Sequence, residues 1–369
     1  MTPSYEPRLR NIRARLENAD ADGCVLYPGP NLYYVSGFFG EPNDRHAIMF
    51  VPTDGPPTFI APQKARGQIE DTAWIEQIIE VEENSGPALA SGLQEYLTDD
   101  FETVLLDDHL PYGIANPIIN RLSNIQWDSV QPVMSKERLR KDDSELADLR
   151  RSAELADRVS TEIRELGDAV IGSTEAEVAN EIRARLSRGG SNRVSFPIVV
   201  ASGPNGDDPW YRHGRREIRP GDPVILDFGG YLDQYASDQT RTVVFAGDPP
   251  EGFGKAYAAV EQAFEAGLAA VEPGSSFAEI PERVREAFRE HDVAENMRHP
   301  PGHGIGLEAH EYPGLTTETQ LEMEPGMVFT LEPGIYYSGE FGIRIEDVIV
   351  VTENGPERLN DSPKTWESL

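Results

Sequence analysis

The first third of the chain shows short apolar runs separated by segments with helical periodicity. Leu9, Ile12 and Leu16 recur on one face and predict an opening helix. Apolar runs predict strands over 24–27, 47–51, 58–61 and 103–106. Helical patterns are present over 88–97 and 114–122. This alternation predicts an α/β domain, which we place over residues 1–134.

A strongly charged stretch, SKERLRKDDSELADLRR, begins at Ser135 and leads into a long predicted helix. We place the start of a second domain at this stretch, so that it spans residues 135–369. A chain of 369 residues is also long for one hydrophobic core, which agrees with two domains.

The second domain contains an internal repeat. The segment GSTEAEV at 172–178 is echoed by GSSFAEI at 274–280. Thr174 with Glu177, and Ser276 with Glu279, each fit the capping box that begins a helix. Each copy is preceded by an Ala-rich helix and followed by a β-hairpin pattern. We therefore expect a duplicated helix-helix-hairpin unit, with its two hairpins face to face about a pseudo-two-fold axis.

The first hairpin, PVILDFGGYLDQYASDQTRTVVF, contains two aspartates that we expect to meet. If the hairpin turns around Leu232 and Asp233, then Asp227 and Asp238 are direct cross-strand partners on one face of the sheet. Two carboxylates so placed repel each other. A shared proton or a bound cation would relieve that repulsion.

The second hairpin, MVFTLEPGIYYSGEFGIRIEDVIVV, repeats the arrangement. Folding it about Gly339 places Glu332 opposite Glu346. Either pair alone would be interpreted as surface acids of a very acidic protein. Two pairs at matching places of a repeat, beside apolar strand residues, favour a site for two divalent metal ions.

Three of the seven histidines lie between the two hairpins, in HPPGHGIGLEAHE: His299, His303 and His310. A single histidine is more often a structural residue, but three in twelve residues indicate a functional site. Four carboxylates and one imidazole suit Mn²⁺, Co²⁺, Fe²⁺ or Zn²⁺. Two such ions can hold a bridging hydroxide and polarise a carbonyl, which predicts hydrolysis of an amide.

The overall charge disfavours several other functions. There are 64 acidic residues against 33 basic ones, a net charge of −31, which disfavours binding to nucleic acid or to anionic membranes. Only five of the basic residues are lysines, a surface typical of proteins that stay soluble at high salt. Without a signal peptide, a transit peptide or a membrane-spanning apolar run, we expect a cytoplasmic protein. The single cysteine, Cys24, excludes a Cys-based zinc cluster and an intrachain disulfide.

The segments LDFGGYLDQYASDQTRT, GHGIGLEAHE, TLEPGIY and GIRIEDV resemble the motifs of the pita-bread metallopeptidases, which include aminopeptidase P, prolidase and methionine aminopeptidase. NLYYVSGF and the Arg-Leu-Arg-Lys linker resemble the creatinase-type amino-terminal domain of the proline-directed members. The spacings of the two acid pairs, eleven and fourteen residues, fit the prolidase and aminopeptidase P branch. The resemblance implies an Xaa-Pro aminopeptidase or Xaa-Pro dipeptidase acting on peptides, and a homodimer.

The resemblance also implies a role for each residue that matches a family motif. It makes five residues the ligands of two metal ions: Asp227, Asp238, His303, Glu332 and Glu346. Asp238 and Glu346 match the bridging positions. Glu332 matches the carboxylate that moves the proton to the leaving nitrogen, and His310 matches a histidine that contacts the substrate. Arg344 matches an arginine that supports the site, and we place His299 beside the ligands.

One segment, ASGPNGDDPWYRHGRREIRPGD, departs from the family pattern. Trp210-Tyr211 stands where the branch usually has a His-His pair, and His213 is two residues out of register. We expect Tyr211 and His213 to contact the substrate. The altered segment leaves open a non-peptidase hydrolase or lyase on the same metal-binding scaffold. A non-catalytic binding module is disfavoured because all five ligands are present.

Overall fold

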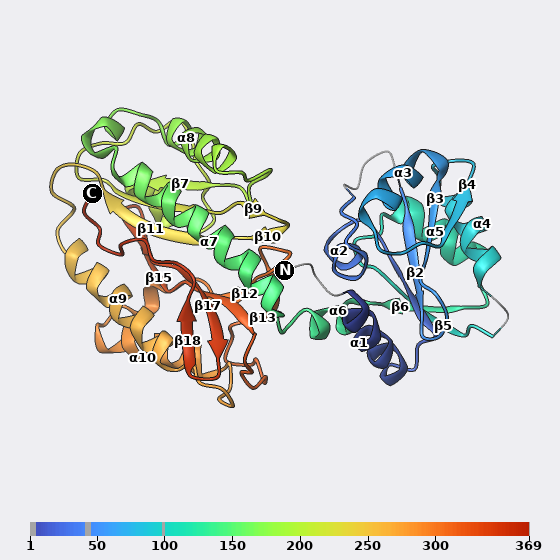
Figure 1. Cartoon of the computed structure of the whole chain (residues 1–369). Coiled ribbons are helices and arrows are strands. Elements are labelled where there is room, and N and C mark those ends of the chain that lie inside the picture. Colours follow the sequence, from blue (N-terminus) through green and yellow to red (C-terminus); the bar gives the residue numbers. More distant parts are fainter. Residues whose placement is uncertain (1–4, 41–45, 98–99, 369) are drawn as a thin grey trace. The chain divides into compact units, whose positions relative to one another are not determined.

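The computed structural model describes residues 5–40, 46–97 and 100–368, and the chain divides into two compact units, Met1–Arg138 and Leu139–Leu369 (Figure 1). The division lies a few residues beyond the boundary predicted at 134. Helix α6 (Gln131–Glu137) belongs to the first unit, because Glu137 accepts hydrogen bonds from Asn11 and Arg15 of α1 (Tyr5–Asn18). Within the described residues, none of the helices is both long and apolar enough to cross a membrane.

The first unit is built on a mixed six-stranded sheet with the order β4-β3-β2-β1-β5-β6. The strands are β1 (Gly23–Leu26), β2 (Ile48–Pro52), β3 (Thr58–Pro62), β4 (Ile78–Val81), β5 (Thr103–Leu106) and β6 (Gln126–Ser129). Besides α1 and α6, the helices are α2 (Pro30–Ser36), α3 (Gln63–Thr72), α4 (Gly86–Tyr96) and α5 (Tyr112–Arg121). The predicted strands and helices are all present, and Cys24 is buried in β1.

The second unit contains two halves of similar make-up, and Figure 1 shows their helix pairs on opposite sides of the strands. The first half comprises α7 (Asp143–Arg164), α8 (Glu175–Arg188), β7 (Val199–Ser202), β8 (Pro223–Phe228), β9 (Tyr231–Leu232), β10 (Tyr235–Ala236) and β11 (Gln239–Val244), with the 3-10 turns η1 (Gly167–Val170) and η2 (Gly203–Asp207). The second half comprises α9 (Phe253–Ala269), α10 (Glu279–Glu290), η3 (Ala294–Asn296), β12 (His303–Gly304), β13 (Glu311–Gly314), β14 (Val328–Leu331), β15 (Gly334–Tyr337), β16 (Phe341–Arg344), β17 (Asp347–Thr352) and β18 (Gly355–Arg358).

The backbone confirms the internal repeat. Gly172 and Gly274 both have a φ of 89°, a conformation that favours glycine. The amide of Gly172 donates to the carbonyl of Ile218, and that of Gly274 donates to the carbonyl of Met323. These two receiving segments each lead, a few residues later, into a strand of a hairpin, β8 or β14. The same local structure therefore begins each half.

The predicted capping box is complete in only one copy. The hydroxyl of Thr174 accepts from the amide of Glu177, and the Glu177 carboxylate accepts from the amide of Thr174, as expected at the start of α8. In the second copy only half of the box is present: the Glu279 carboxylate accepts from the amide of Ser276 over 3.4 Å, but the hydroxyl of Ser276 accepts from the amide of Ala278 instead of that of Glu279. A turn precedes the helix and is closed by a hydrogen bond from the Glu279 amide to the Ser276 carbonyl, so α10 begins at Glu279.

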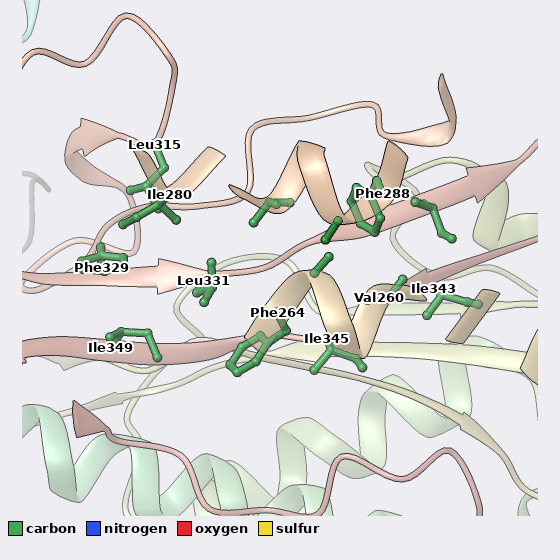
Figure 2. Close-up of a cluster of buried hydrophobic side chains, with 14 of the residues drawn as sticks. Val260, Phe264, Ile280, Phe288, Leu315, Phe329, Leu331, Ile343, Ile345 and Ile349 are labelled. Carbon is green, nitrogen blue, oxygen red and sulfur yellow. The ribbon is translucent and has the colours of Figure 1, made fainter. Parts of the chain in front are cut away.

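A hydrophobic cluster fixes the strands that carry the second acid pair. It joins α9 and α10 to the strands through residues that include Val260, Phe264, Ile280, Phe288, Phe329, Leu331, Ile345 and Ile349 (Figure 2). Leu331 and Ile345 directly precede Glu332 and Glu346, and both are fully buried in this cluster. Because successive side chains of an extended chain point to opposite sides, packing Leu331 and Ile345 inward directs the two glutamates away from the helices.

Candidate metal centre

The first hairpin brings its two aspartates together, but with a register that differs from the prediction. Asp227 pairs with Thr240, so Asp227 and Asp238 are not direct partners. The turn falls at Asp233 and Gln234, one residue later than predicted, and both have positive φ as a type I′ turn requires. Asp238 is two residues from Thr240 and thus shares its face. Both aspartates line the same pocket.

The second hairpin has the predicted register. The pairing of β14 with β17 and that of β15 with β16 are both centred on Gly339. This register places Glu332 opposite Glu346 in the short gap between the two ladders. The backbone amides of Glu332 and Glu346 do not form hydrogen bonds with each other. The Glu332 amide donates to the carbonyl of Pro301, and the Glu346 amide donates to the carbonyl of Thr240. The second acid pair is therefore confirmed in position.

All five predicted ligands lie in one pocket, whose volume is about 510 Å³. Ligand atoms of Asp238, His303 and Glu346 lie within 4.8 Å of one another. The Nε2 atom of His303 is 3.3 Å from Oε1 of Glu332 and 3.8 Å from Oδ2 of Asp238. The pocket thus gathers four carboxylates and one imidazole from segments more than a hundred residues apart.

The donors fit a metal ion in two specific respects. The Nδ1 atom of His303 lies 3.0 Å from the carbonyl of Gly304, so Nδ1 carries the hydrogen and the Nε2 lone pair faces the carboxylates. Oδ1 of Asp227 is buried without a hydrogen-bond partner among the described residues. A buried carboxylate oxygen without a donor is costly unless a cation approaches it.

The carboxylates perturb one another strongly. Burial, and next the charges of Glu346 and Asp227, raise the pKa of Asp238. Burial, followed by the charges of Glu332 and Asp227, raises the pKa of Glu346. Burial also raises the pKa of Glu332, although His299 and Arg344 oppose that shift. Full ionisation of this group therefore requires more positive charge than the protein itself supplies.

Arg344 is the cation that the protein does supply. Its guanidinium lies 2.5 Å from Oδ2 of Asp227 and also donates to the hydroxyls of Thr240 and Tyr336, at 3.2 and 2.7 Å. The Thr240 hydroxyl in turn donates a hydrogen bond to Oε2 of Glu346 over 2.6 Å. Arg344 therefore contacts one predicted ligand directly and a second through Thr240, and its supporting role stays a prediction.

The other two histidines flank the ligands. Nε2 of His299 lies 2.7 Å from the hydroxyl of Tyr336, and its Nδ1 lies 3.8 Å from Oε2 of Glu332. His299 is therefore beside the ligand set, where it was predicted. The ring of His310 stacks on that of His303 with centroids 4.0 Å apart, and it lines the pocket. Partial burial and the neighbouring His303 lower the pKa of His310.

The predicted substrate contacts Tyr211 and His213 lie elsewhere. The Tyr211 hydroxyl donates to Glu175 over 2.8 Å, and burial together with this hydrogen bond raises its pKa to about 12. Nδ1 of His213 lies 2.8 Å from the carbonyl of Ile198. The residues on either side of Tyr211, Trp210 and Arg212, line the pocket instead. No local pattern identifies them, because residues 209–210 lie in a turn closed by the hydrogen bond from the Tyr211 amide to the Asp208 carbonyl.

Comparison with known proteins finds two family models that match the chain. Residues 147–353 match metallopeptidase family M24, and residues 8–140 match the creatinase/prolidase N-terminal domain. A probable dipeptidase, PepE, from Mycobacterium tuberculosis is 32% identical, over 97% of this chain and 95% of its own. A prolidase structure from Thermococcus sibiricus is similar with a TM-score of 0.93 and 31% identity over the whole of both chains. An X-Pro aminopeptidase structure from Thermotoga maritima has a TM-score of 0.85 and 25% identity, covering 98% and 99% of the two chains.

Proposed function

The chain belongs to metallopeptidase family M24, and from this we propose that it hydrolyses the peptide bond before proline, using two divalent metal ions. It combines the creatinase-type N-terminal domain with the M24 domain, as predicted, and it is a peptidase. Preference for an Xaa-Pro bond is supported by the prolidases and the X-Pro aminopeptidase among its structural neighbours. The observation that carries the proposal is the buried group of four carboxylates facing Nε2 of His303.

Five residues would hold the two ions: Asp227, Asp238, His303, Glu332 and Glu346. Their hard oxygen donors and single imidazole suit Mn²⁺ first, and also Co²⁺, Zn²⁺ or Fe²⁺. When bound, such ions acidify water and polarise a carbonyl. The Thr240 hydroxyl and the Arg344 guanidinium hold Glu346 and Asp227 in place, so that little reorganisation is needed when ions arrive.

The remaining site residues supply proton transfer and orientation. Burial favours the protonated form of Glu332, which suits a carboxylate that accepts a proton from the attacking water and gives it to the proline nitrogen. His310 lines the pocket and can donate a hydrogen bond to the scissile carbonyl oxygen as it gains charge. A proline nitrogen carries no hydrogen in the peptide bond, so it must gain this proton in order to leave.

The proposal is tested with protein loaded with Mn²⁺ or Co²⁺ and assayed on Ala-Pro, on Ala-Pro-Ala and on Ala-Ala. We expect release of alanine from the proline substrates. Asp238→Ala should remove both metal binding and hydrolysis, whereas Asp233→Ala, in the exposed turn of the same hairpin, should preserve both. Absence of hydrolysis in wild-type protein with two metal ions verified as bound would refute the proposed function.

Three expectations from the sequence stay predictions: manganese as the resident metal, a homodimer and a cytoplasmic location. Metal analysis of protein purified without added metals tests the first. Sedimentation equilibrium tests the second, with a mass near twice that of the 40.9 kDa chain expected. Fractionation of the source cells tests the third.

A further inference from the structure

One short segment carries the two histidines whose rings stack in the pocket, His303 and His310, with ring centroids 4.0 Å apart. The strand β12 ends at Gly304, and its register with β13 shifts between His303 and Gly304. His310 itself is exposed, so the position of its ring depends on the backbone that carries it. We call residues 303–311 the histidine loop.

The carboxylate of Glu311 lies inside the histidine loop. Its Oε1 accepts a hydrogen bond from the amide of Glu308 over 3.1 Å. A Cβ built at Gly306 would lie 2.8 Å from the same oxygen, so only glycine leaves room for the carboxylate there. The carbonyl of Gly306 accepts from the amide of Ala236, in the hairpin that carries Asp238. The Glu311 side chain therefore shapes the loop between the two histidines.

Lys141 contacts the other oxygen of this carboxylate. Its Nζ lies 3.2 Å from Oε2 of Glu311, and the two side chains are only 1% and 6% exposed. The amide of Lys141 donates to the carbonyl of Gly326, so Lys141 is also fixed through its backbone. Lysine and glutamate are almost never fully buried unless they are paired. The pair joins residues 170 positions apart and connects the charged segment at the start of the second unit with the histidine loop.

A buried ion pair of this kind is a poor source of stability. Removing two charges from water costs free energy that their attraction must first repay, and such pairs can often be replaced by apolar residues without loss. Only five of the 33 basic residues are lysines, and one of them occupies this buried position. A pair with little net effect on stability can still select one conformation of a loop. The hydrogen bond from Glu308 and the contact with Gly306 give this pair the means to do so.

We propose that Lys141 and Glu311 are positioning residues, which hold the histidine loop so that His310 stays stacked on His303 in the pocket. The kinetic part of this inference rests on the proposed function. Lys141 compensates the charge of the carboxylate, and the carboxylate holds the amide of Glu308. Without that hydrogen bond the loop moves, and His310 moves with it, although every predicted metal ligand is still present. A misplacement of about 1 Å in a group of this kind can lower a rate by about a hundredfold.

Two double variants separate positioning from stability. Removing one partner alone would leave a buried unpaired charge, so both variants remove both charges and differ only in the acceptor left for the Glu308 amide. In Lys141→Met with Glu311→Gln, the glutamine oxygen can still accept that hydrogen bond. In Lys141→Met with Glu311→Met, this acceptor is lost. Arg140→Met is the matched control, because it removes a neighbouring charge whose ion pair with Glu324 is exposed.

The kinetic readout is hydrolysis of Ala-Pro by protein loaded with Mn²⁺. The glutamine variant and Arg140→Met should keep kcat within about threefold of wild type, whereas the methionine variant should lose about ten- to hundredfold. The Kd for Mn²⁺ should be unchanged in all three, and urea titration gives the stability at which each kcat is compared. Gly306→Ala leaves both charges in place but displaces the carboxylate, so it should lower kcat as well and serves if a double variant does not fold.

NMR of metal-free protein with labelled histidine rings observes the stack of His303 and His310 directly. Their ring signals should shift in the Glu311→Met double variant and in Gly306→Ala, and should match wild type in the other two proteins. The inference is overturned if the methionine variant keeps wild-type kcat and ring signals, or if the glutamine variant loses as much kcat as the methionine variant. If metal-loaded wild-type protein does not hydrolyse Ala-Pro, the proposed function fails, and the ring signals alone decide the inference.

Discussion

Replacing Asp238 with asparagine should stabilise the metal-free protein while removing its metal site. In the metal-free state Asp238 is buried against Glu346, and both carboxylates favour protonation because of burial and mutual repulsion. An asparagine amide keeps nearly the same shape and removes one of the repelling charges. Most point substitutions destabilise a protein, so a gain in stability would be a specific consequence of the crowded charges.

The magnitude follows from the geometry. Ligand atoms of Asp238 and Glu346 lie within 4.8 Å, and at an effective dielectric constant of about 20 two unit charges at that distance repel by about 3.5 kcal/mol. Partial protonation relieves some of this, and the Thr240 hydroxyl stabilises Glu346 over 2.6 Å. We therefore expect Asp238→Asn to raise the free energy of unfolding by about 2 kcal/mol. In a domain of this size that raises the unfolding midpoint by about 4 to 8 °C.

The pH dependence has a definite sign. A carboxylate whose folded pKa is raised binds its proton more tightly in the folded state, so its contribution to stability is present below the ordinary pKa of about 4 and is lost as pH rises through the raised value. Chelator-treated wild-type protein should therefore lose stability over the interval from about pH 4 upward. Asp238→Asn should show a smaller change over the same interval.

Thermal unfolding of chelator-treated and Mn²⁺-loaded protein measures both effects. Mn²⁺ at a hundred times its Kd should stabilise wild type by about 2.7 kcal/mol and should leave Asp238→Asn unchanged, so the order of stability reverses on adding metal. Asp233→Asn is the matched control, because its carboxylate is 58% exposed in the same hairpin. The reasoning is refuted if metal-free Asp238→Asn is less stable than wild type, or if both respond equally to Mn²⁺.

Two further substitutions test the framework of the site. Arg241→Met should lower the free energy of unfolding by about 3 to 5 kcal/mol in urea titrations, because it breaks the buried ion pair of Arg241 with Asp347. It should also weaken Mn²⁺ binding, because the Arg241 guanidinium donates to the carbonyl of Glu346, a predicted metal ligand. Arg283→Met, which breaks an exposed ion pair, should cost less than about 1 kcal/mol. Gly342→Ala would place a Cβ 1.9 Å from the carbonyl oxygen of Gly206, so it should lower the free energy of unfolding by about 1 to 3 kcal/mol in the same urea titrations. Gly254→Ala is the control: its Cβ would lie in open space in α9, so the substitution should be neutral or slightly stabilising.

The sequence predicted the buried strands of the first unit better than its edge strands. The strands β1, β2, β3 and β5 lie inside the sheet and are continuous apolar runs. Strands β4 and β6 are the two edges, and most of their side chains are at least partly exposed. Trp127 is the one apolar residue of β6, so a search for apolar runs missed that strand. The predicted fold class did not depend on them, because the alternation of helices and strands was already clear.

In the candidate site, features that depend on neighbouring residues in the sequence could be predicted, and features that depend on distant residues could not. The register of Glu332 and Glu346 could be predicted because Gly339 marks the turn. The turn at Asp233 and Gln234 has no glycine at either position that needs a positive φ, so the first hairpin was misplaced. The orientation of Tyr211 depends on Glu175, a residue 36 positions away that no local pattern connects with it.

The duplicated architecture gives a physical reason for the proposed dependence of the site on metal. Each half contributes one acid pair from its own hairpin, and in an isolated half those acids could be hydrated by water. When the halves pack together, the acids become buried near one another and lose that hydration, while Arg344 compensates only part of the charge. His303, from the segment between the hairpins, adds a neutral donor with no further charge. Packing the halves therefore concentrates negative charge, and the proposed binding of cations and the predicted instability of the metal-free state follow from this same cause.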